Sequence, residues 1–338
     1  MMIVLTGGGT GGHLNIVRCL LESATQKNLE CIYIGSENGQ DKAWFENEER
    51  FKAKYFLSST GVVNQSKFKK LKALKHILSL SFECRKIFKE HEVKAVFSVG
   101  GYSAAPASFG AIFSHIPLFI HEQNSKSGSL NSFLKPFSKG FFSAFEKEFT
   151  PYPIAEDFFT LARQRKELKT IIFLGGSQGA KFINTLAIKL APKLVEKGIK
   201  IIHQCGKDDY EICKKAYEEL GLKIDLFAFH SNLALKMQEA DLAISRAGAS
   251  TLFELCANTL PCVFIPYPYA AKNHQFFNAK FLQDKALCQI FTQEQCRNEK
   301  ALLTSIFTMN LEYLSQRLQG VAQKNGADLM LKKALNSL

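Results

Sequence analysis

The chain begins Met1-Met2-Ile3-Val4-Leu5-Thr6-Gly7-Gly8-Gly9-Thr10-Gly11-Gly12-His13, an apolar run that leads directly into a glycine-rich segment. Five of the eight residues from Thr6 to His13 are glycine. Without a Cβ atom, glycine lets backbone N–H groups approach a polar or anionic ligand at the positive end of a helix dipole. We therefore expect a strand, a ligand-binding loop and a helix start. His13 is then the first ionisable side chain that a bound substrate meets.

The second half of the chain repeats this pattern. Apolar runs alternate with helical patterns in both halves, as is typical of parallel α/β folds. In each half, two apolar runs are followed by glycines, and a third run begins with proline. The paired segments are Ile3–Leu5 with Gly7–Gly12 and Ile171–Leu174 with Gly175–Gly179, Val96–Tyr102 and Leu242–Gly248, and Pro117–Ile120 and Pro261–Ile265.

These repeats predict two Rossmann-like domains. The stretch Thr150-Pro151-Tyr152-Pro153 precedes a polar segment and is the expected boundary. The predicted parts are residues 1–150, residues 151–325, and a terminal helix over 326–338 that packs back on the first domain. Ligands of such folds bind beyond the carboxyl ends of the strands, so we expect the glycine loops of both domains to face one cleft.

Composition narrows the class of protein. The chain has 338 residues and a net charge of +12, which indicates an anionic partner such as phosphate, nucleic acid or a membrane surface. No signal peptide is expected, because Met1-Met2 leads straight into an apolar strand. The nine cysteines are scattered without a Cys-x-x-Cys spacing, so we expect reduced thiols and no zinc site.

An uncharged stretch over residues 95–120 raises the question of a membrane span. It contains Gly100-Gly101, Pro106, Gly110 and Pro117, and it is rich in serine and alanine. These residues favour a strand, a loop, a helix and a second strand over a spanning helix.

His13 has two readings. It is either a histidine at a helix start that bonds to a neighbouring loop, or a general base. The positive end of a helix disfavours the imidazolium ion, so a ring at this place would be neutral at pH 7 and able to accept a proton. A polar cluster, His121-Glu122-Gln123-Asn124, ends another buried strand, and we expect it to line a ligand site rather than a structural network.

A second helix start follows Arg246-Ala247-Gly248, at Ser250 or Thr251. Small residues there would let a diphosphate approach the helix N–H groups. Glu254 lies one turn into this helix and would either cap it or hold ribose hydroxyls. Asn273, His274, Gln275 and Asn278 supply amides suited to sugar hydroxyls.

An alternative is a dinucleotide-binding enzyme. Gly7, Gly9 and Gly12 satisfy Gly-x-Gly-x-x-Gly, and Glu37 follows the next predicted strand, where it would hold a ribose. The pattern alone is weak, and the doubled glycines before His13 are less typical of it. No Asp-x-Asp and no Cys/His cluster with metal spacing occurs, so leaving-group charge would be handled by helix dipoles and side chains.

The stretch 67–89 is basic and carries apolar residues at helical spacing. One reading is a helix that buries its apolar stripe in its own domain. The other is an interfacial helix whose lysines attract anionic lipid while apolar side chains insert. Nucleic acid is a poorer third reading, because no nucleic-acid module is present.

Taken together, the motifs resemble the MurG family, the bacterial N-acetylglucosaminyltransferases that convert lipid I to lipid II in peptidoglycan synthesis. They occur in the family's order over nearly the whole chain. The segments that carry the resemblance are Gly8–His13, Gly100-Gly101-Tyr102, His121–Asn124, Gly175–Ala180 and Arg246–Glu254.

The resemblance implies a GT-B fold and an inverting, metal-independent transfer of N-acetylglucosamine from UDP-N-acetylglucosamine to the 4-hydroxyl of the muramoyl sugar of lipid I. It also implies a peripheral protein on the cytoplasmic face of the inner membrane, with the first domain meeting the membrane and the lipid-linked acceptor. His13 is the first candidate for the base and Glu122 the second. The implied substrate contacts are Thr10, Gly11, Gly12, Asn124, Ser177, His230, Arg246, Ala249, Ser250, Thr251, Leu252, Phe253, Glu254 and Gln275.

Two positions depart from the family's pattern. Ile16 stands where a proline is usual, and Ala155 stands where an arginine usually contacts the donor. Arg163 or Arg165 could substitute for that arginine. The competing class is a non-catalytic protein that binds a sugar nucleotide or lipid and has lost the chemistry. The presence of His13, Glu122, Glu254 and Gln275 together argues against it.

Overall fold

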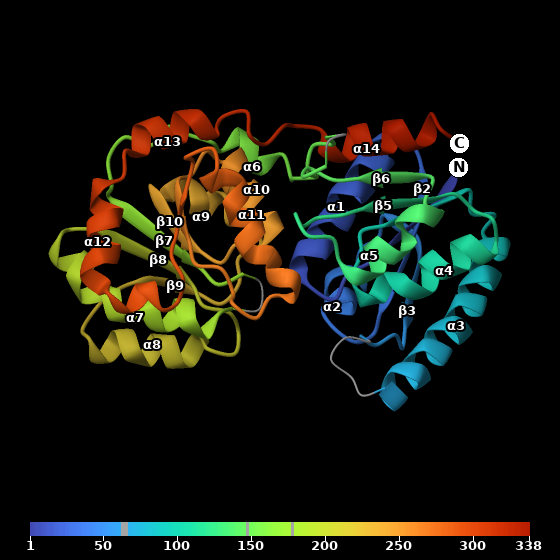
Figure 1. Ribbon diagram of the computed structural model, residues 1–338, viewed down its shortest axis with the longest axis horizontal. Coiled ribbons are helices and arrows are strands. Elements are labelled where there is room, and N and C mark those ends of the chain that lie inside the picture. The colour runs from blue at the N-terminus through green and yellow to red at the C-terminus, as the bar shows by residue number, and fades with distance from the viewer. Residues whose placement is uncertain (62–66, 147–148, 177–178) are drawn as a thin grey trace. The chain divides into compact units, whose positions relative to one another are not determined.

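The computed structural model describes residues 1–61, 67–146, 149–176 and 179–338, without the side chains of 67–70. The chain divides into two compact units (Figure 1). Unit 1 comprises Met1–Ile154 together with Asn325–Leu338, and unit 2 comprises Ala155–Lys324.

Unit 1 is built on a six-stranded parallel sheet with the strand order β3-β2-β1-β4-β5-β6. Its helices and 3-10 turns flank this sheet (Figure 1). The strands are β1 (Met2–Thr6), β2 (Glu30–Ser36), β3 (Phe51–Leu57), β4 (Ala95–Ser98), β5 (Leu118–His121) and β6 (Gly140–Phe142). The helices are α1 (Gly11–Gln26), α2 (Asp41–Phe45), α3 (Lys67–Glu90), η1 (Tyr102–Ala104), α4 (Ala105–Phe113), α5 (Ser129–Leu134), η2 (Lys135–Phe137) and α14 (Gly326–Leu335).

Unit 2 has its own six-stranded parallel sheet with the order β12-β11-β10-β7-β8-β9. The strands are β7 (Thr170–Leu174), β8 (Lys200–Gln204), β9 (Asp225–Phe227), β10 (Leu242–Ser245), β11 (Cys262–Phe264) and β12 (Gln289–Ile290). The helices are α6 (Asp157–Thr160), α7 (Lys181–Glu196), α8 (Tyr210–Glu219), α9 (Leu233–Glu239), α10 (Ala249–Ala257), η3 (Ala271–Asn273), α11 (His274–Gln283), η4 (Gln295–Arg297), α12 (Glu299–Thr308) and α13 (Leu311–Leu318).

The two sheets have the same topology. Counted within its own unit, each sheet has the strand order 3-2-1-4-5-6 of the doubly wound dinucleotide-binding fold. In such a sheet the strand order reverses between the first and fourth strands, and ligands bind at that point, beyond the carboxyl ends. The strand order reverses between β1 and β4 in unit 1, and between β7 and β10 in unit 2. The α/β class and the internal repeat predicted from the sequence are confirmed.

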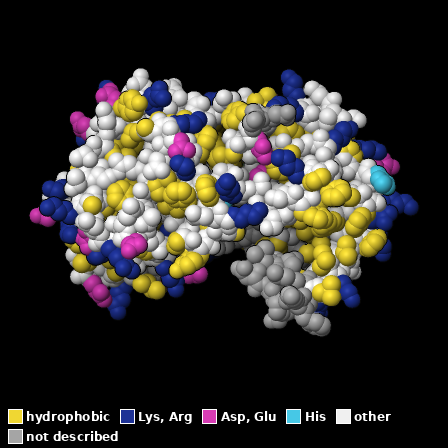
Figure 2. All heavy atoms as spheres, viewed as in Figure 1, with side chains coloured by type: hydrophobic (Ala, Val, Ile, Leu, Met, Phe, Trp, Pro, Cys, Tyr) yellow, Lys and Arg dark blue, Asp and Glu magenta, His cyan; other side chains and the backbone are white. Residues whose placement is uncertain are grey.

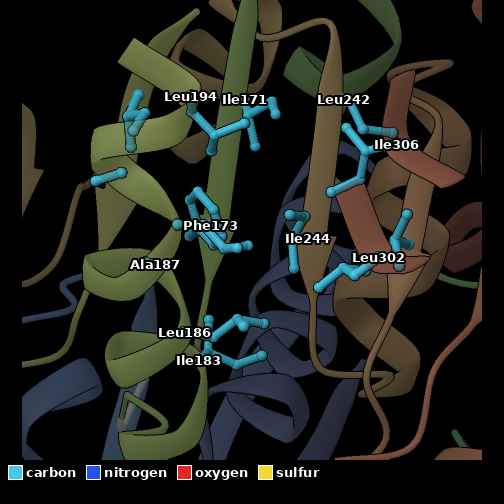
Figure 3. Packing of buried hydrophobic residues seen from close by; sticks show 14 of the residues in the cluster. Ile171, Phe173, Ile183, Leu186, Ala187, Leu194, Leu242, Ile244, Leu302 and Ile306 are labelled. Atoms are coloured by element: carbon cyan, nitrogen blue, oxygen red, sulfur yellow. The ribbon is translucent and has the colours of Figure 1, made fainter. Parts of the chain in front are cut away.

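Each sheet is covered on both faces, which explains why its central strands read as continuous apolar runs. All five residues of β1 and all five of β7 are buried. In unit 2, Ile171, Phe173 and Ile244 pack between α7 and α12 (Figure 3). In unit 1, Val4, Ile32 and Val96 contribute to a separate core that α3 and α4 help to close.

The uncharged stretch over 95–120 forms β4, η1, α4 and β5, as predicted. Within the part of the chain that the structure describes, no helix combines the length and apolar character needed to cross a membrane. All nine cysteines are buried free thiols. At the other end of the chain, α14 packs against α1, and Gly326 lies directly against the backbone of Pro151 and Tyr152.

Candidate functional site

In unit 1, the loop between β1 and α1 packs backbone to backbone against the loop that follows β4. Gly7 and Gly9 have φ values of +122° and +81°, and Gly101 has +80°, a region that side-chain-bearing residues rarely adopt. A Cβ on Gly7 would lie 2.5 Å from the oxygen of Gly100. One on Gly101 would lie 2.5 Å from the oxygen of Gly8. The glycines are therefore needed to bring the two loops together.

A buried carboxylate, Asp41, holds this loop from behind. Its Oδ2 accepts the N–H of Gly9 at 2.6 Å, and its Oδ1 accepts the N–H of Ser36 and the hydroxyl of Tyr33. Sequence reasoning missed Asp41, because a single acidic residue at the start of a short helix carries no pattern. The one sequence sign of Asp41 is the glycine at position 8. Any larger residue there would place its Cβ against Oδ1 of Asp41.

Asp41 also weakens the dinucleotide alternative. The N–H of Gly9 is bonded to Asp41, and that of Gly8 to the oxygen of Gly100 at 3.3 Å. A diphosphate at these glycines would meet an internal carboxylate that already occupies the amide donor. Glu37, which would hold the ribose, is an exposed residue after β2.

His13 lies in the first turn of α1, half-buried. Thr10, the residue before the helix, does not cap it with its side chain; its Oγ1 lies 2.9 Å from Nδ1 of His13. The Nε2 of Gln123 lies 2.8 Å from Nε2 of His13. The structure thus brings the first glycine loop and the polar cluster after β5 into contact.

Glu122 is almost fully buried, and its carboxylate is bonded within its own loop. Oε1 accepts the N–H of Asn124 at 2.9 Å. Oε2 accepts the N–H of Gly128 and the side-chain amide of Asn131, both at 3.0 Å. Three donors engage its two oxygens and organise the loop. Asn124, a predicted donor contact, is half-buried on the same loop.

His121 is the fully buried neighbour of this cluster. Its ring packs edge-on against Tyr152, with the centroids 5.3 Å apart. Burial, with a smaller contribution from nearby His13, lowers the pKa of His121 to about 3. The His121 side chain is therefore uncharged across the physiological pH range.

In unit 2, the second glycine loop lies between β7 and α7. Gly176 and Gly179 have φ values of +85° and +76°. A Cβ at Gly179 would clash with the oxygen of Cys205, whereas one at Gly176 would meet nothing within 4 Å. The predicted donor contact Ser177 lies outside the described residues.

The helix α10 follows β10, the strand that pairs with β7. It begins at Ala249, one residue before the predicted start, because Gly248 adopts the extended N-cap conformation and its oxygen accepts the N–H of Leu252 at 2.9 Å. A Cβ at Gly248 would meet no atom within 4 Å, so the approach to the first-turn N–H groups is open. Ser250 and Thr251 belong to that first turn, and Glu254 lies one turn later, 6% exposed.

Leu252 and Phe253, two other predicted contacts on α10, have fully buried side chains. The structure assigns these side chains to the core of unit 2. Ala249, Ser250 and Thr251 place their backbone N–H groups in the first turn of α10.

Gln275 and Arg246 both bond to the loop that follows β11. The Oε1 of Gln275 accepts the N–H of Tyr267 at 2.9 Å, which leaves its amide N–H groups to donate. Arg246 is largely buried: its guanidinium donates to the oxygens of Ile265 and Pro266 and stacks on the ring of Tyr267. Nearby, the side chain of Asn278 donates to the oxygen of Ala247 at 3.1 Å and fixes the turn before α10.

His230 follows β9, at the far edge of the same sheet. Its Nδ1 accepts the N–H of Asn232 at 3.1 Å, and its ring packs edge-on against Phe227. The neighbouring Phe229 is exposed. An exposed aromatic ring is suited to stacking on the face of a nucleobase.

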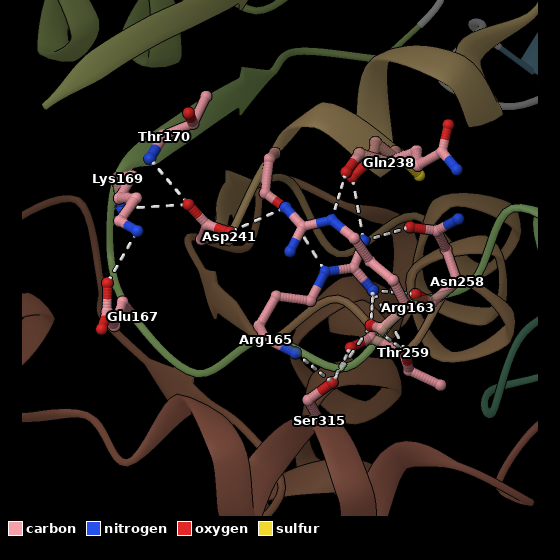
Figure 4. Close-up of polar contacts among 12 residues, drawn as sticks. Arg163, Arg165, Glu167, Lys169, Thr170, Gln238, Asp241, Asn258, Thr259 and Ser315 are labelled. Atoms are coloured by element: carbon pink, nitrogen blue, oxygen red, sulfur yellow. Dashed lines mark hydrogen bonds and ion pairs between the residues drawn. The ribbon is translucent and has the colours of Figure 1, made fainter.

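Arg163 and Arg165 do not replace the linker arginine that is missing at Ala155. Arg165 is fully buried and donates to oxygens of Met237, Ala240 and Asn258 (Figure 4). Arg163 donates to the oxygens of Gln238 and Ala240 and pairs with Asp241 at 2.7 Å. Both side chains tie the chain before β7 to the end of α9, so this expectation is wrong. Bonds to these buried oxygens engage all three nitrogens of the Arg165 guanidinium, and Nε and Nη2 of Arg163.

Ile16, the other departure, is fully buried in the interior of α1. Among the residues that the structure describes, no group of three or more His, Cys, Asp or Glu side chains is placed to hold a metal ion.

Family models match both units. The glycosyltransferase family 28 N-terminal domain matches residues 3–143, and the family 28 C-terminal domain matches residues 170–333. Among solved structures, MurG of Acinetobacter baumannii superposes with a TM-score of 0.78 at 26% identity and covers 99% of each chain. A UDP-GlcNAc 2-epimerase from Neisseria meningitidis, at 12% identity and a TM-score of 0.64, shares the fold alone.

Curated relatives agree over the whole length. The UDP-N-acetylglucosamine–N-acetylmuramyl-(pentapeptide) pyrophosphoryl-undecaprenol N-acetylglucosamine transferase of Campylobacter jejuni subsp. doylei is 71% identical over 337 residues, covering 100% of this chain and 98% of the relative. The enzyme of the same name from Wolinella succinogenes is 51% identical over 332 residues, covering 98% of both. With its GT-B architecture of two doubly wound units, this chain belongs to glycosyltransferase family 28 and, within it, to the MurG family of N-acetylglucosamine transferases.

Proposed function

We propose that this chain transfers N-acetylglucosamine from UDP-N-acetylglucosamine to the muramoyl 4-hydroxyl of lipid I, with inversion at the anomeric carbon. The observation that carries the proposal is the pairing of two sites on one chain of this family. Unit 1 holds a histidine between Thr10 and Gln123 at a helix start, and unit 2 has an open helix start with Glu254 behind it.

The donor is assigned to unit 2. The open amino end of α10 supplies N–H groups and the positive end of a dipole, which offset the charge of the leaving diphosphate. Glu254 is the candidate for the ribose hydroxyls, and the amide N–H groups of Gln275 are candidates for the sugar hydroxyls. His230 and the exposed ring of Phe229 are candidates for the uracil.

The acceptor is assigned to unit 1. The 4-hydroxyl oxygen attacks the anomeric carbon as the bond to the UDP oxygen breaks, and His13 takes the hydroxyl proton. UDP leaves as an anion, and the new linkage is β. Thr10, Gly11 and Gly12, which precede His13 in the chain, and Asn124, which follows Gln123, are proposed contacts of unit 1 to the donor. We propose no metal or other cofactor for this reaction.

A turnover assay tests the proposal. The full chain is mixed with UDP-N-acetylglucosamine and a lipid I analogue, and the disaccharide product and released UDP are measured. One calorimetric titration with UDP and one with NAD accompany the assay. Turnover with UDP binding is the expected result. UDP binding without turnover would identify a non-catalytic sugar-nucleotide-binding protein, and NAD binding would support a dinucleotide enzyme.

We further propose that unit 1 meets an anionic membrane surface through α3, which places the protein peripherally on the cytoplasmic face of the inner membrane. One side of α3 packs into unit 1 through Ile77, Cys84 and Ile87, in line with the structural reading. The other side exposes Leu71, Leu74 and Leu78, beside the exposed Lys72 and Lys75. Exposed leucines next to lysines are what the interfacial reading requires.

Vesicle partition tests the membrane proposal. Lys72→Glu with Lys75→Glu, and then with Lys69→Glu and Lys70→Glu added, should weaken binding to vesicles that contain anionic lipid. The control is Lys214→Glu with Lys215→Glu, on α8 of unit 2. It changes the net charge as much as the Lys72/Lys75 double variant does, and it should bind as the wild type does. Unchanged partition of the α3 variants would return the helix to a purely structural role.

A further inference from the structure

A row of five phenylalanine rings crosses the surface of unit 1. It runs from Phe82 on α3 to Phe113 and Phe109 on α4, then to Phe133 on α5 and Phe137 on η2. Successive ring centroids are 5.9, 6.3, 6.1 and 6.0 Å apart. We call these five residues the phenylalanine row.

The phenylalanine row is exposed to an unusual degree. Phe82, Phe133 and Phe137 are 53%, 59% and 57% exposed, and Phe113 is 36% exposed. Hydrophobic side chains gather over α3, α4 and α5 on this face (Figure 2). A continuous apolar surface on a protein of net charge +12 marks a binding surface, because leaving phenyl rings in water forfeits the free energy of their burial.

One part of the row is anchored to the acceptor side of the proposed site. The first turn of α5 is bonded to Glu122: the N–H of Gly128 and the amide of Asn131 both donate to its Oε2. The residue after Glu122 is Gln123, which contacts His13. Phe133 is two residues beyond Asn131 on the same helix. The row therefore connects the loop beside the candidate base with the membrane-facing helix α3.

We propose that the phenylalanine row binds the polyprenyl chain of the acceptor, an inference that rests on the proposed function. The relatives named above act on a pyrophosphoryl-undecaprenol substrate. A sugar on such a carrier must reach the site while its hydrocarbon chain stays out of water. A single file of rings, each in contact with the next, matches the shape of one methyl-branched chain, and the apolar area that each isoprene unit buries adds to affinity.

The position of α5 and η2 distinguishes this role from contact with the bilayer alone. The exposed leucines of α3 lie beside lysines and suffice for an interfacial helix. Phe133 and Phe137 extend the apolar surface away from α3 and toward the helix that carries the Glu122 contacts. Between them in the chain, Lys135 pairs with Glu146 at 2.7 Å, and its ammonium group lies over the ring of Phe141.

The test compares acceptors that differ only in chain length. Wild type and the double variant Phe133→Ser/Phe137→Ser are assayed in micelles of a neutral detergent. One lipid I analogue carries a two-isoprene chain and the other a seven-isoprene chain. Both side chains are exposed, so the variant should fold, and its melting temperature is checked. Phe307→Ser, an exposed phenylalanine on α12 of unit 2, is the matched control.

The expected result is a KM that rises roughly tenfold for the long-chain acceptor only, with kcat unchanged. Phe133→Leu/Phe137→Leu should recover most of the loss. Equal effects on both acceptors, or none on either, would overturn the proposal. So would lost vesicle partition with an unchanged KM for the long-chain acceptor, which would make the row a bilayer contact. Failure of the wild type to turn over either acceptor would refute the proposed function instead.

Discussion

The Nε2 of Gln123 lies 2.8 Å from the Nε2 of His13, and the Oγ1 of Thr10 lies 2.9 Å from its Nδ1. With the amide of Gln123 as donor, Nε2 of His13 accepts and Nδ1 carries the proton that bonds to Thr10. The ring is then a neutral base whose lone pair points to Gln123. In the proposed reaction, the acceptor hydroxyl takes the place of that amide.

Replacing His13 with alanine should reduce kcat by ~10²–10⁴ and leave UDP affinity nearly intact, because it removes the proton acceptor and none of the donor's proposed contacts. Steady-state kinetics and calorimetry measure the two effects. His115→Asn, an exposed histidine of unit 1 in a left-handed conformation that asparagine tolerates, is the control. Near-normal turnover by the His13 variant would remove it from the mechanism.

Glu122→Gln separates a base from a loop organiser. The new amide group would face N–H donors at one of the two oxygens, so we expect a loss of about 1–3 kcal/mol in the free energy of unfolding. Activity should fall together with stability. If Glu122 were the base, kcat would collapse while the urea-unfolding midpoint stayed close to that of the wild type.

Asp41→Asn tests how the glycine loop is held. The neutral amide keeps the volume but weakens the bond to the N–H of Gly9, so the position of Thr10 and His13 should loosen. We expect kcat to fall about tenfold with a much smaller change in the KM for UDP-N-acetylglucosamine, because most of the donor's proposed contacts lie in unit 2. Asp41→Glu should also impair the enzyme, since Gly8 leaves no room for a longer side chain. Equal losses in kcat and donor affinity would argue for general misfolding.

Arg165→Met should destabilise unit 2 by about 3–5 kcal/mol, because it leaves the oxygens of Met237 and Asn258 without their donor. The folded fraction should bind UDP as the wild type does. Arg50→Met, which removes an exposed arginine paired with Glu48, should cost far less. A variant at Arg165 that stayed stable and lost UDP affinity would restore this residue as a donor contact.

Acid should destabilise the protein through buried histidines. Burial lowers the pKa of His203 to about 4, and the pKa of His121 to about 3. Below pH 6.5 the unfolded chain takes up protons that the folded chain does not, so stability is present above pH 6.5 and falls as the pH drops toward 4. Between pH 7 and pH 5 each histidine should cost about 2 kcal/mol.

Urea unfolding at the two pH values measures this loss. His203→Gln should lower stability at pH 7, because the contacts of His203 with Tyr217 and Asn184 are disturbed, but it should flatten the pH dependence. His115→Asn, which changes an exposed histidine, should keep the full slope. An unchanged slope in the His203 variant would show that this residue is protonated in the folded state.

The sequence predicts those parts of the fold and site that glycine encodes. Gly7, Gly9 and Gly176 adopt backbone conformations that other residues avoid, so their positions mark the loops, and the repeat in the chain corresponds to two sheets of one topology. The sequence shows Glu122 in a polar cluster after a strand. Its bonds to Gly128 and Asn131 could not be predicted, because they depend on how the following loop turns back.

The sequence does not predict which charged side chains are buried. Arg163 and Arg165 lie in a polar stretch that predicts solvent exposure, and only the packing of α9 and Asn258 against them makes Arg165 a core residue. Asp41 is the acidic counterpart, invisible until β2 and the glycine loop meet around it. Such groups bond to backbone from distant segments, and the pattern of neighbouring residues carries no record of those partners.

The packing of α14 on α1 has a consequence for biosynthesis. Met330, Leu331 and Ala334 are buried in unit 1, yet the ribosome makes them only after all of unit 2. Until they emerge, the helix that begins beside His13 has an uncovered side. Unit 2 is therefore synthesised in full before unit 1 receives its last helix, and unit 1 is the part of the nascent chain most dependent on protection from aggregation.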